Sequence, residues 1–239
     1  RLAPFFIAAQ KTLSGLAPQH RENPRVLLLS NGPASPNYFE DAYLSRYLGY
    51  TLVEGGDLAV RNSQVMLKTL GGLPPVDVIL RRQNSDDCDP LELNSESELG
   101  IAGLIQAART GEVAIANPLG SGLVESTAFM AFMPQLCRAL LDEDLLMPGV
   151  ATWWCGHPDG LAHVLKNLDG LNVHPAFRRR GKDGSTREAL SQMPLDELAE
   201  TIRANPGQFA AQEQVVRSSA PVWRRDLEPA HVVLRAYLV

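Results

Sequence analysis

Cysteine and long apolar runs are both scarce in this sequence of 239 residues. The three cysteines, Cys88, Cys137 and Cys155, lie far apart with no paired spacing. This pattern is not that of a disulfide framework or a zinc site, and it predicts a reduced, cytoplasmic setting. No apolar run approaches the roughly 20 residues that a membrane-spanning helix needs, so we expect no membrane partner.

A strong excess of charge of one sign is also missing. The chain has 22 lysines and arginines against 27 aspartates and glutamates, a formal net charge of −5. This balance gives no electrostatic reason to expect nucleic acid or an anionic membrane as a partner. The first residue is Arg1 rather than methionine, and the last residues, 231–239, are expected to form a strand. We therefore expect the sequence to be a piece of a longer polypeptide.

The strongest structural signal is a strand–helix–strand pattern near the beginning. Val26–Leu29 is a run of large apolar residues, typical of a strand buried on both faces. After a small polar loop, Ser35 is predicted to cap a helix that begins at Pro36 and ends at Gly49. The next strand covers 50–54. Such units build parallel sheets, whose ligands lie beyond the carboxyl ends of the strands.

Apolar runs and turn residues predict the remaining elements. They are a lead-in helix over 3–17, a hairpin over 58–68, strands over 76–82 and 113–116, a helix over 99–109, and a helical stretch over 124–141 that Pro134 kinks or breaks. Further along come strands over 150–154 and 171–174, helices over 157–168 and 194–204, a basic loop over 178–185, and strands over 209–216 and 231–239. A change of composition near Pro148 divides an α/β domain with a Rossmann-like sheet, 1–148, from a smaller α+β segment, 149–239.

Three loops follow strands of the predicted parallel sheet and should share one edge of it: 30–36, 82–90 and 117–126. Gly120-Ser121-Gly122 could offer backbone N–H groups to a phosphate or carboxylate. A plain tight turn is the favoured interpretation, because neither a Walker lysine nor a G-x-G-x-x-G pattern accompanies these residues.

A pair of arginines, Arg81 and Arg82, ends one predicted strand and is followed by three aspartates, Asp86, Asp87 and Asp89. An arginine here could clamp an anionic substrate, and the aspartates could hold Mg²⁺. For the aspartates a mutually neutralising surface loop is favoured. For one of the two arginines we expect a structural ion pair.

Ordered motifs along the whole length carry a family resemblance. They are SPxYFExAYLxRYLG over 35–49, LVEGxDL over 52–58, PVDVILRR over 75–82, CDPL over 88–91, ANPLGSGLVES over 116–126, ATWWC over 151–155 and AQEQ over 211–214. With these motifs the sequence resembles the circularly permuted ATP-grasp proteins of type 2, relatives of the glutathionylspermidine-synthetase type of carboxylate–amine ligase.

The resemblance implies a pre-ATP-grasp domain up to about residue 148, followed by the first subdomain of an ATP clamp. An active member joins a carboxylate to an amine through an acyl-phosphate, with ATP and Mg²⁺ as cofactors. The implied nucleotide contacts are His174, Gln212, Glu213, Gln214 and Arg235, with residues 212–214 on the hinge strand that borders adenine. The implied substrate contacts are Arg82, Asn117, Gly120, Ser121 and Gly122.

The sequence departs from active relatives where the phosphates would bind. Their lysine–proline pair and glycine-rich loop are matched here by His174-Pro175 and a bulky basic run that includes 178–180, and Val233 stands where active relatives tend to carry an aspartate. The acidic metal-binding motif of the family lies outside this chain. The chain is therefore similar to the degenerate, inactive members, which are often fused to a helical domain called alpha-E, and we assign no catalytic residue and no metal ligand.

Three functional hypotheses follow from the sequence. The first is a degenerate ATP-grasp domain that serves a peptide synthesis or modification system, with an alpha-E domain or peptide-modification proteins as partners. The second is an ATP-dependent ligase, active in a full-length protein, in which His174 or an arginine of 178–180 replaces the lysine. The third is a Rossmann-like domain that binds a small anion at Gly120-Ser121-Gly122. We expect no ligase activity from this chain alone.

Overall fold

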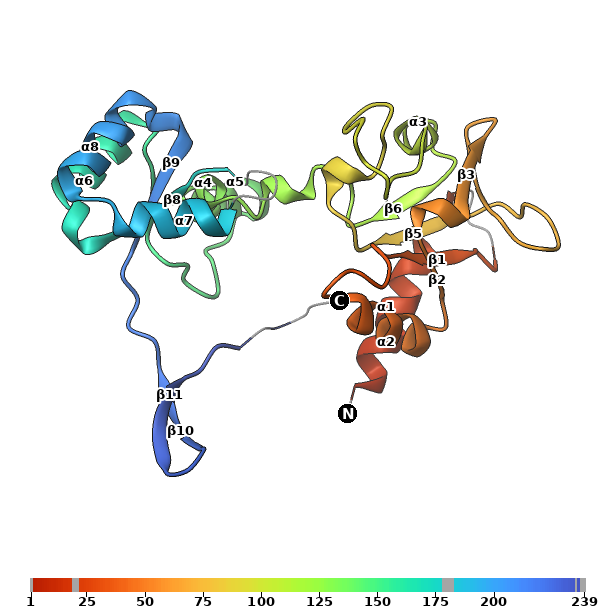
Figure 1. Cartoon of the computed structure of the whole chain (residues 1–239), viewed down its shortest axis with the longest axis horizontal. Helices are drawn as coiled ribbons and strands as arrows, with labels where there is room; N and C mark the ends of the chain where they lie inside the picture. The colour runs from red at the N-terminus through yellow and green to blue at the C-terminus, as the bar shows by residue number, and fades with distance from the viewer. Residues whose placement is uncertain (1, 19–21, 178–182, 235, 237–239) are drawn as a thin grey trace. The chain divides into compact units, whose positions relative to one another are not determined.

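The computed structural model describes residues 2–18, 22–177, 183–234 and 236, with side chains omitted at 183–185 (Figure 1). The chain separates into two compact units, of which unit 1 extends to Ser121 and unit 2 begins at Gly122. Within the described ranges, no helix is both long enough and apolar enough to cross a membrane. The domain boundary expected near residue 148 stays a prediction.

Unit 1 is built on a parallel sheet of four strands. They are β1 (Val26–Leu29), β2 (Thr51–Val53), β5 (Val78–Arg81) and β6 (Ala114–Ala116), in the order β2-β1-β5-β6. All four residues of β1 are buried, as the apolar run predicts for a central strand. Because the strands are parallel, the loops after β1, β5 and β6 begin at the same edge of the sheet, as expected.

The helices of unit 1 are α1 (Ala3–Gly15), α2 (Tyr38–Leu48) and α3 (Leu104–Arg109), with short 3₁₀ turns η2 (Gly55–Asp57) and η3 (Ser85–Asp87). The turn η4 (Ser121–Leu123) begins at the last residue of unit 1 and continues into unit 2. Helices α1 and α2 lie side by side, and the side-chain amide of Gln10 donates to the carbonyl of Leu48 at 2.9 Å. Gly49 ends α2 with a left-handed φ of 69°, as predicted.

Two predicted helix starts are wrong. Helix α2 begins at Tyr38 rather than Pro36, because the preceding residues form a turn in which the Ser35 hydroxyl accepts from the N–H of Asn37 at 3.3 Å. Helix α3 begins at Leu104 rather than residue 99. Its start is set by Gly103, whose φ of 85° does not belong to a right-handed helix.

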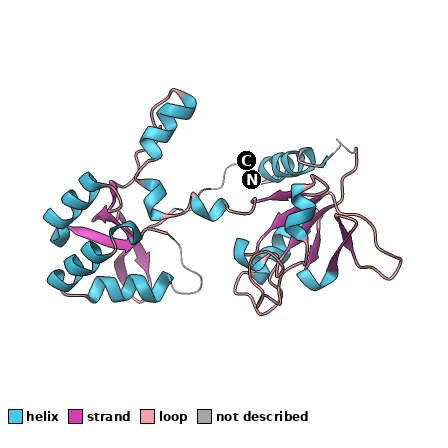
Figure 2. Ribbon diagram, turned by 90° about the horizontal axis from the view of Figure 1, so that it is seen from above, coloured by secondary structure: helices cyan, strands magenta, loops and turns pink. Residues whose placement is uncertain are grey.

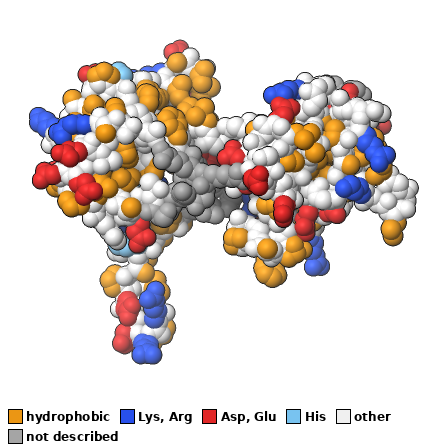
Figure 3. Space-filling model, turned by 45° about the horizontal axis from the view of Figure 1, so that its top comes forward, with side chains coloured by type: hydrophobic (Ala, Val, Ile, Leu, Met, Phe, Trp, Pro, Cys, Tyr) orange, Lys and Arg blue, Asp and Glu red, His pale blue; other side chains and the backbone are white. Residues whose placement is uncertain are grey.

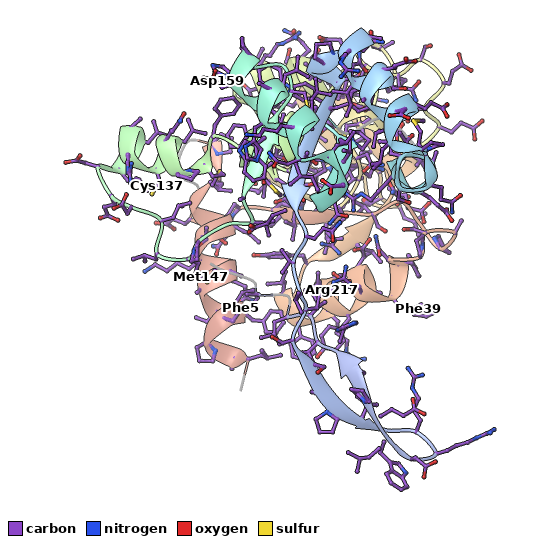
Figure 4. All side chains as sticks on the ribbon, turned by 90° about the vertical axis from the view of Figure 1, so that its left-hand side faces the viewer. Phe5, Phe39, Cys137, Met147, Asp159 and Arg217 are labelled. Carbon is purple, nitrogen blue, oxygen red and sulfur yellow. The ribbon has the colours of Figure 1, made fainter. Side chains whose placement is uncertain are left out.

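Helix α2 buries polar side chains and exposes aromatic ones, which is the reverse of a simple amphipathic helix. Asp41, Ser45 and Leu48 are buried. The aromatic residues that recur at helical spacing lie outside: Phe39 is 86% exposed, and Tyr43 and Tyr47 are about half exposed (Figure 4). The inner face of α2 therefore serves a polar network, which is described below.

A hairpin of β3 (Leu58–Arg61) and β4 (Gln64–Leu67) completes unit 1. Its two turn residues, Asn62 and Ser63, have φ values of 51° and 63°. Positive φ at both central positions is the geometry of a type I′ turn, which matches the twist of paired strands. The hairpin was predicted at this position and is confirmed.

Unit 2 is built on an antiparallel sheet of β7 (Thr152–Trp154), β8 (Leu171–Pro175) and β9 (Phe209–Glu213), in the order β7-β9-β8. Its helices are α4 (Thr127–Met130), α5 (Met133–Leu141), α6 (Pro158–Lys166), α7 (Asp183–Gln192) and α8 (Leu195–Ala204), with 3₁₀ turns η5 (Leu168–Gly170) and η6 (Pro206–Gln208) (Figure 2). The main core packs Val164, Leu198 and Ile202 against β8 and β9.

Unit 2 confirms one prediction in the helical stretch and corrects two elsewhere. The stretch breaks between α4 and α5, with Pro134 in the first turn of α5. The basic loop predicted over 178–185 is wrong from Asp183 onward, where α7 begins, and 178–182 lie outside the described residues. Strand β9 ends at Glu213 rather than at residue 216.

Of the terminal strand predicted over 231–239, only His231 is a strand residue among the described ones, and the rest of the prediction is wrong for 232–234. His231 ends β11 (Leu227–His231), which forms an antiparallel hairpin with β10 (Ser219–Trp223). The hairpin carries exposed apolar side chains at Trp223 and Leu227 and charged residues at its tip (Figure 3). Residues 235 and 237–239 lie outside the described residues.

Candidate functional site

The carboxyl edge of the unit 1 sheet is closed by Arg81. This side chain is only 7% exposed. Its guanidinium donates to the carbonyl of Asn117 at 2.7 Å, to the carbonyl of Pro118 and the hydroxyl of Ser121, each at 3.1 Å, and to the carbonyl of Gln83. Arg81 therefore ties the loop after β6 to the end of β5, and its donors are directed at the protein itself.

Arg82 points to the other side of the strand and pairs with α2. Its Nε donates to Asp41 at 2.7 Å and its Nη2 donates to Glu40 at 2.6 Å. Asp41 is 1% exposed and also accepts from the Ser30 hydroxyl at 2.8 Å. Burial alone would lower the pKa of Arg82, but the hydrogen bond and charge of Asp41 outweigh it and raise the pKa. This is the ion pair expected of one arginine, with its carboxylates supplied by α2 rather than by the acidic loop.

The other implied substrate contacts lie along the loop that follows β6. Asn117 has a left-handed φ of 60°, and its amide donates to the carbonyl of Arg81 at 3.1 Å. The N–H of Gly120 points at the Ser85 hydroxyl at 3.3 Å, and the Ser121 hydroxyl accepts from Arg81. A side-chain atom placed on Gly122 would meet nothing within 4 Å. The polar groups of Asn117, Gly120 and Ser121 thus have protein partners, which is the arrangement of a structured turn.

The acidic loop is not the surface loop expected at Asp89. This residue is fully buried, and its carboxylate accepts from the backbone N–H groups of Leu91 at 2.9 Å, Gly103 at 3.2 Å and Ile105 at 3.0 Å. Asp89 therefore satisfies the free N–H groups at the start of α3. Across the residues that the structure describes, no group of three or more histidine, cysteine, aspartate or glutamate side chains is placed to hold a metal ion.

Two of the three cysteines, Cys88 and Cys155, are poor nucleophiles in this fold. All three are free, and both Cys88 and Cys155 are buried. Burial raises the pKa of each of these two thiols to about 11. Because the thiolate is the reactive form, neither side chain offers covalent catalysis near neutral pH.

Unit 2 has a cleft of about 770 Å³ beside β8 and β9. Four of the five implied nucleotide contacts line it: His174, Gln212, Glu213 and Gln214. The fifth, Arg235, lies outside the described residues. The volume is in the range of small-molecule sites. The sheet therefore brings together residues that are about 40 positions apart in the sequence.

The antiparallel register puts two of these residues on one face of the sheet. Asn172 of β8 pairs with Gln212 of β9, and two residues further along β8, His174 pairs with Ala210. Since side chains alternate along a strand, His174 and Gln212 share a face. The amide nitrogen of Gln212 donates to the Thr152 hydroxyl at 3.1 Å, so this side chain is held in place from β7. Glu213 lies on the opposite face, where its carboxylate accepts from the N–H of Ala151 at 3.3 Å.

His174 lines the cleft, and part of its imidazole ring is buried in the protein. Its Nδ1 is buried and makes no hydrogen bond to any residue that the structure describes. Burial, and then the positive charge of Arg187, lower the pKa of this imidazole below its ordinary value of 6.5. The ring is therefore neutral at neutral pH. A neutral ring still has one donor and one acceptor nitrogen.

Arg187 is a functional candidate that the sequence gave no reason to choose. It lies on α7, which packs beside β8 (Figure 1), and it lines the cleft together with Glu188 and Ser191 of the same helix. The helix is anchored by Leu190, which enters the core of unit 2. Because the basic loop was expected to extend to residue 185, no helical spacing pointed to Arg187. A second arginine of the cleft, Arg217, lies beyond β9 (Figure 4).

Comparison with known proteins gives a family match over the whole length. A family described as circularly permuted ATP-grasp type 2 matches residues 1–239. An uncharacterized protein of Mycobacterium tuberculosis is 38% identical over 237 residues, which cover 99% of this chain and 26% of that protein. An uncharacterized protein of Synechocystis is 34% identical over 230 residues, covering 96% of this chain and 48% of that protein.

Among solved structures, D-alanyl-alanine synthetase A from Vibrio cholerae aligns with a TM-score of 0.40 and 11% sequence identity, over 87% of this chain and 66% of that one. The chain spans about a quarter of the length of the mycobacterial relative and about half of the cyanobacterial one.

Proposed function

Because the chain belongs to the circularly permuted ATP-grasp type 2 family, we propose that it is a nucleotide-binding part of a ligase-like protein that has lost the phosphate-binding lysine. In this proposal residues 1–148 supply the pre-ATP-grasp domain and residues 149–239 the first subdomain of the ATP clamp. The observation that carries the proposal is the cleft of unit 2, in which His174 stands where the family resemblance places that lysine.

The residues of the cleft fit a nucleotide in three respects. The space of about 770 Å³ suits a drug-sized molecule, and His174 lines it. Arg187 and Arg217 supply positive charge for phosphates. Strand β9 carries Gln212 and Glu213 at the position that the resemblance assigns to the adenine border.

The same residues support a degenerate site. ATP, when bound to an active member of the family, phosphorylates the carboxylate substrate, and that step places negative charge on the transferring phosphoryl group. A fixed cation stabilises this charge, whereas a neutral imidazole provides none. Since the pKa of His174 is lowered, the ring at the lysine position is uncharged at neutral pH before a ligand binds, so it lacks the permanent charge of a lysine. We therefore expect binding without turnover from this chain.

Two functional alternatives remain as proposals. The observation that favours an active ligase is Arg187, a cation in the same cleft as His174 that could take over the role of the lysine. An anion site at Gly120-Ser121-Gly122 is less supported, because Gly120 and Ser121 have partners within unit 1. By resemblance, we further propose an alpha-E domain or a peptide-modification protein as the partner of the longer protein.

Calorimetric titration of MgATP into the 239-residue chain, with a parallel assay of phosphate release, tests the proposal. We expect measurable binding, no phosphate release, and tighter binding in His174→Lys, because that variant adds the missing charge. Sustained phosphate release by the unaltered chain would replace the degenerate function with the ligase alternative. No binding of ATP at millimolar concentration would overturn the nucleotide-binding function itself.

A further inference from the structure

The cleft of unit 2 is lined by two arginines, Arg187 and Arg217, by the carboxylates of Asp169, Glu188 and Glu213, and by the neutral His174. Arg187 on α7 and His174 on β8 both line the cleft, and α7 packs beside β8. Arg187 is exposed, and His174 is half-buried with its Nδ1 inside the protein. The Arg187 side chain is thus accessible to a ligand in the cleft, whereas Nδ1 of His174 is buried and has no hydrogen-bond partner among the described residues.

We propose that Arg187 is the residue that holds the phosphates of the bound nucleotide, and that His174 takes up a proton when those phosphates arrive. This inference rests on the proposed nucleotide-binding function. It assigns the positive charge at this site to a helical arginine 13 residues after the lysine position, rather than to the residue at that position.

The charges around the imidazole explain the proton uptake. Without ligand, Arg187 and burial both disfavour the imidazolium, which lowers the pKa of His174. A phosphate between the two residues would bring negative charge close to the ring and would accept a hydrogen bond from the imidazolium, so the charged form becomes favoured. The other charged groups that line the cleft are Asp169 of η5, Glu188 of α7, Glu213 of β9 and Arg217 beyond β9.

Binding of three probes to the full chain separates the phosphate contact from the rest of the site: MgATP, adenosine and inorganic tripolyphosphate. We expect the unaltered chain to bind MgATP more tightly than adenosine, and we expect Arg187→Gln to lose this preference, with affinity for MgATP and tripolyphosphate falling about tenfold or more. Arg203→Gln is the matched control, because Arg203 is an exposed arginine of α8 that does not line the cleft. It should bind all three probes as the unaltered chain does.

The outcomes distinguish the two proposals. If the unaltered chain prefers MgATP to adenosine and Arg187→Gln keeps that preference, the role of Arg187 is overturned while nucleotide binding stands. The same conclusion follows if Arg217→Gln, rather than Arg187→Gln, removes the preference. If only tripolyphosphate binds, and binding depends on Arg187, the phosphate contact stands and nucleotide binding falls. If none of the probes binds, both proposals fail.

The proposed proton uptake by His174 is tested by a separate measurement. Calorimetry in two buffers of different ionisation enthalpy at pH 7 measures the protons exchanged, and we expect net uptake by the unaltered chain that disappears in His174→Gln. An NMR titration of the imidazole without ligand should show a higher pKa for His174 in Arg187→Gln than in the unaltered chain. Equal proton uptake by the unaltered chain and His174→Gln would overturn the role of His174.

Discussion

The ion pair of Arg82 and Asp41 joins strand β5 to helix α2 at the edge of the unit 1 sheet. Asp41 is almost fully buried, and the Arg82 side chain is 25% exposed. Removing one partner of a buried pair leaves a charge without compensation, which costs more than the pair itself contributes. We expect Arg82→Met to lower the free energy of unfolding by about 3 kcal/mol, measured by urea denaturation and circular dichroism.

A surface pair provides the control for this prediction. Arg109 and Glu92 lie 2.5 Å apart at the surface, with 63% of the arginine side chain exposed. Arg109→Met should cost less than about 1 kcal/mol. Adding Asp41→Asn to Arg82→Met should recover part of the loss, because it removes the stranded carboxylate. Equal costs for Arg82→Met and Arg109→Met would show that the buried position of Asp41 is not what matters.

His174 makes the stability of unit 2 depend on pH. Its pKa in the folded chain is lowered from 6.5, first by burial and then by Arg187. The unfolded chain therefore binds a proton at this residue at a higher pH than the folded chain does. The neutral imidazole of His174 therefore contributes to the free energy of unfolding fully above pH 6.5. This contribution is lost as the pH falls from 6.5 toward the pKa of His174 in the folded chain. The difference in unfolding free energy between the unaltered chain and His174→Gln, followed from pH 7.5 to 5, should decline in that window; a constant difference would refute this.

Single site residues could be predicted from the sequence only where a family motif marks their position. The motif alignment placed His174 and residues 212–214 on elements that do line one cleft. It had no means of finding Asp41 as the partner of Arg82, since that contact joins residues 41 positions apart. Arg187 was missed because its helix could not be read from the sequence, so its place in the cleft could not be inferred.

At the scale of elements, the β3–β4 hairpin shows a local conformation that its sequence does not fully favour. Ser63 adopts a φ of 63°, which costs a residue with a β-carbon more than it costs glycine. Asn-Gly is the preferred pair for this turn type. Ser63→Gly should therefore stabilise unit 1 by about 0.5 to 1 kcal/mol in a denaturation experiment, despite the larger entropy of the unfolded chain.

Substitution by alanine is the control for the turn. Ser63→Ala keeps the β-carbon and should bring no such gain. If glycine destabilises the chain as much as alanine does, the turn does not have the positive φ that carries this prediction.

The elements that the sequence reveals are those with strong local signals. Four buried residues of β1 and the helix stop at Gly49 are of this kind. Helix α7 is different, because Gly184 and Ser185 are weak helix formers and Leu190 packs into the core only once the fold has formed. The β10–β11 hairpin pairs Pro221 with Pro229, and proline in a run argues against a strand. Both elements depend on contacts that a local pattern does not contain.

At the scale of the whole molecule, the chain contains separate hydrophobic cores. Ile79 lies in the core of unit 1 and Ile202 in that of unit 2, and each side chain is fully buried. None of the core clusters formed by the described residues combines residues of both units. A unit with its own core can unfold as its own cooperative transition. We therefore expect the two units to unfold independently.

Tryptophan fluorescence can test this independence, because all three tryptophans, Trp153, Trp154 and Trp223, belong to unit 2. Ile202→Ala leaves a cavity in the core of unit 2. It should lower the free energy of unfolding, measured from the tryptophan transition in urea, by about 3 kcal/mol. Ile79→Ala should leave that transition in place while it lowers a transition seen by far-ultraviolet circular dichroism. If Ile79→Ala moves the tryptophan transition as far as Ile202→Ala does, the units unfold together, and the cleft around His174 depends for its stability on the parallel sheet of unit 1.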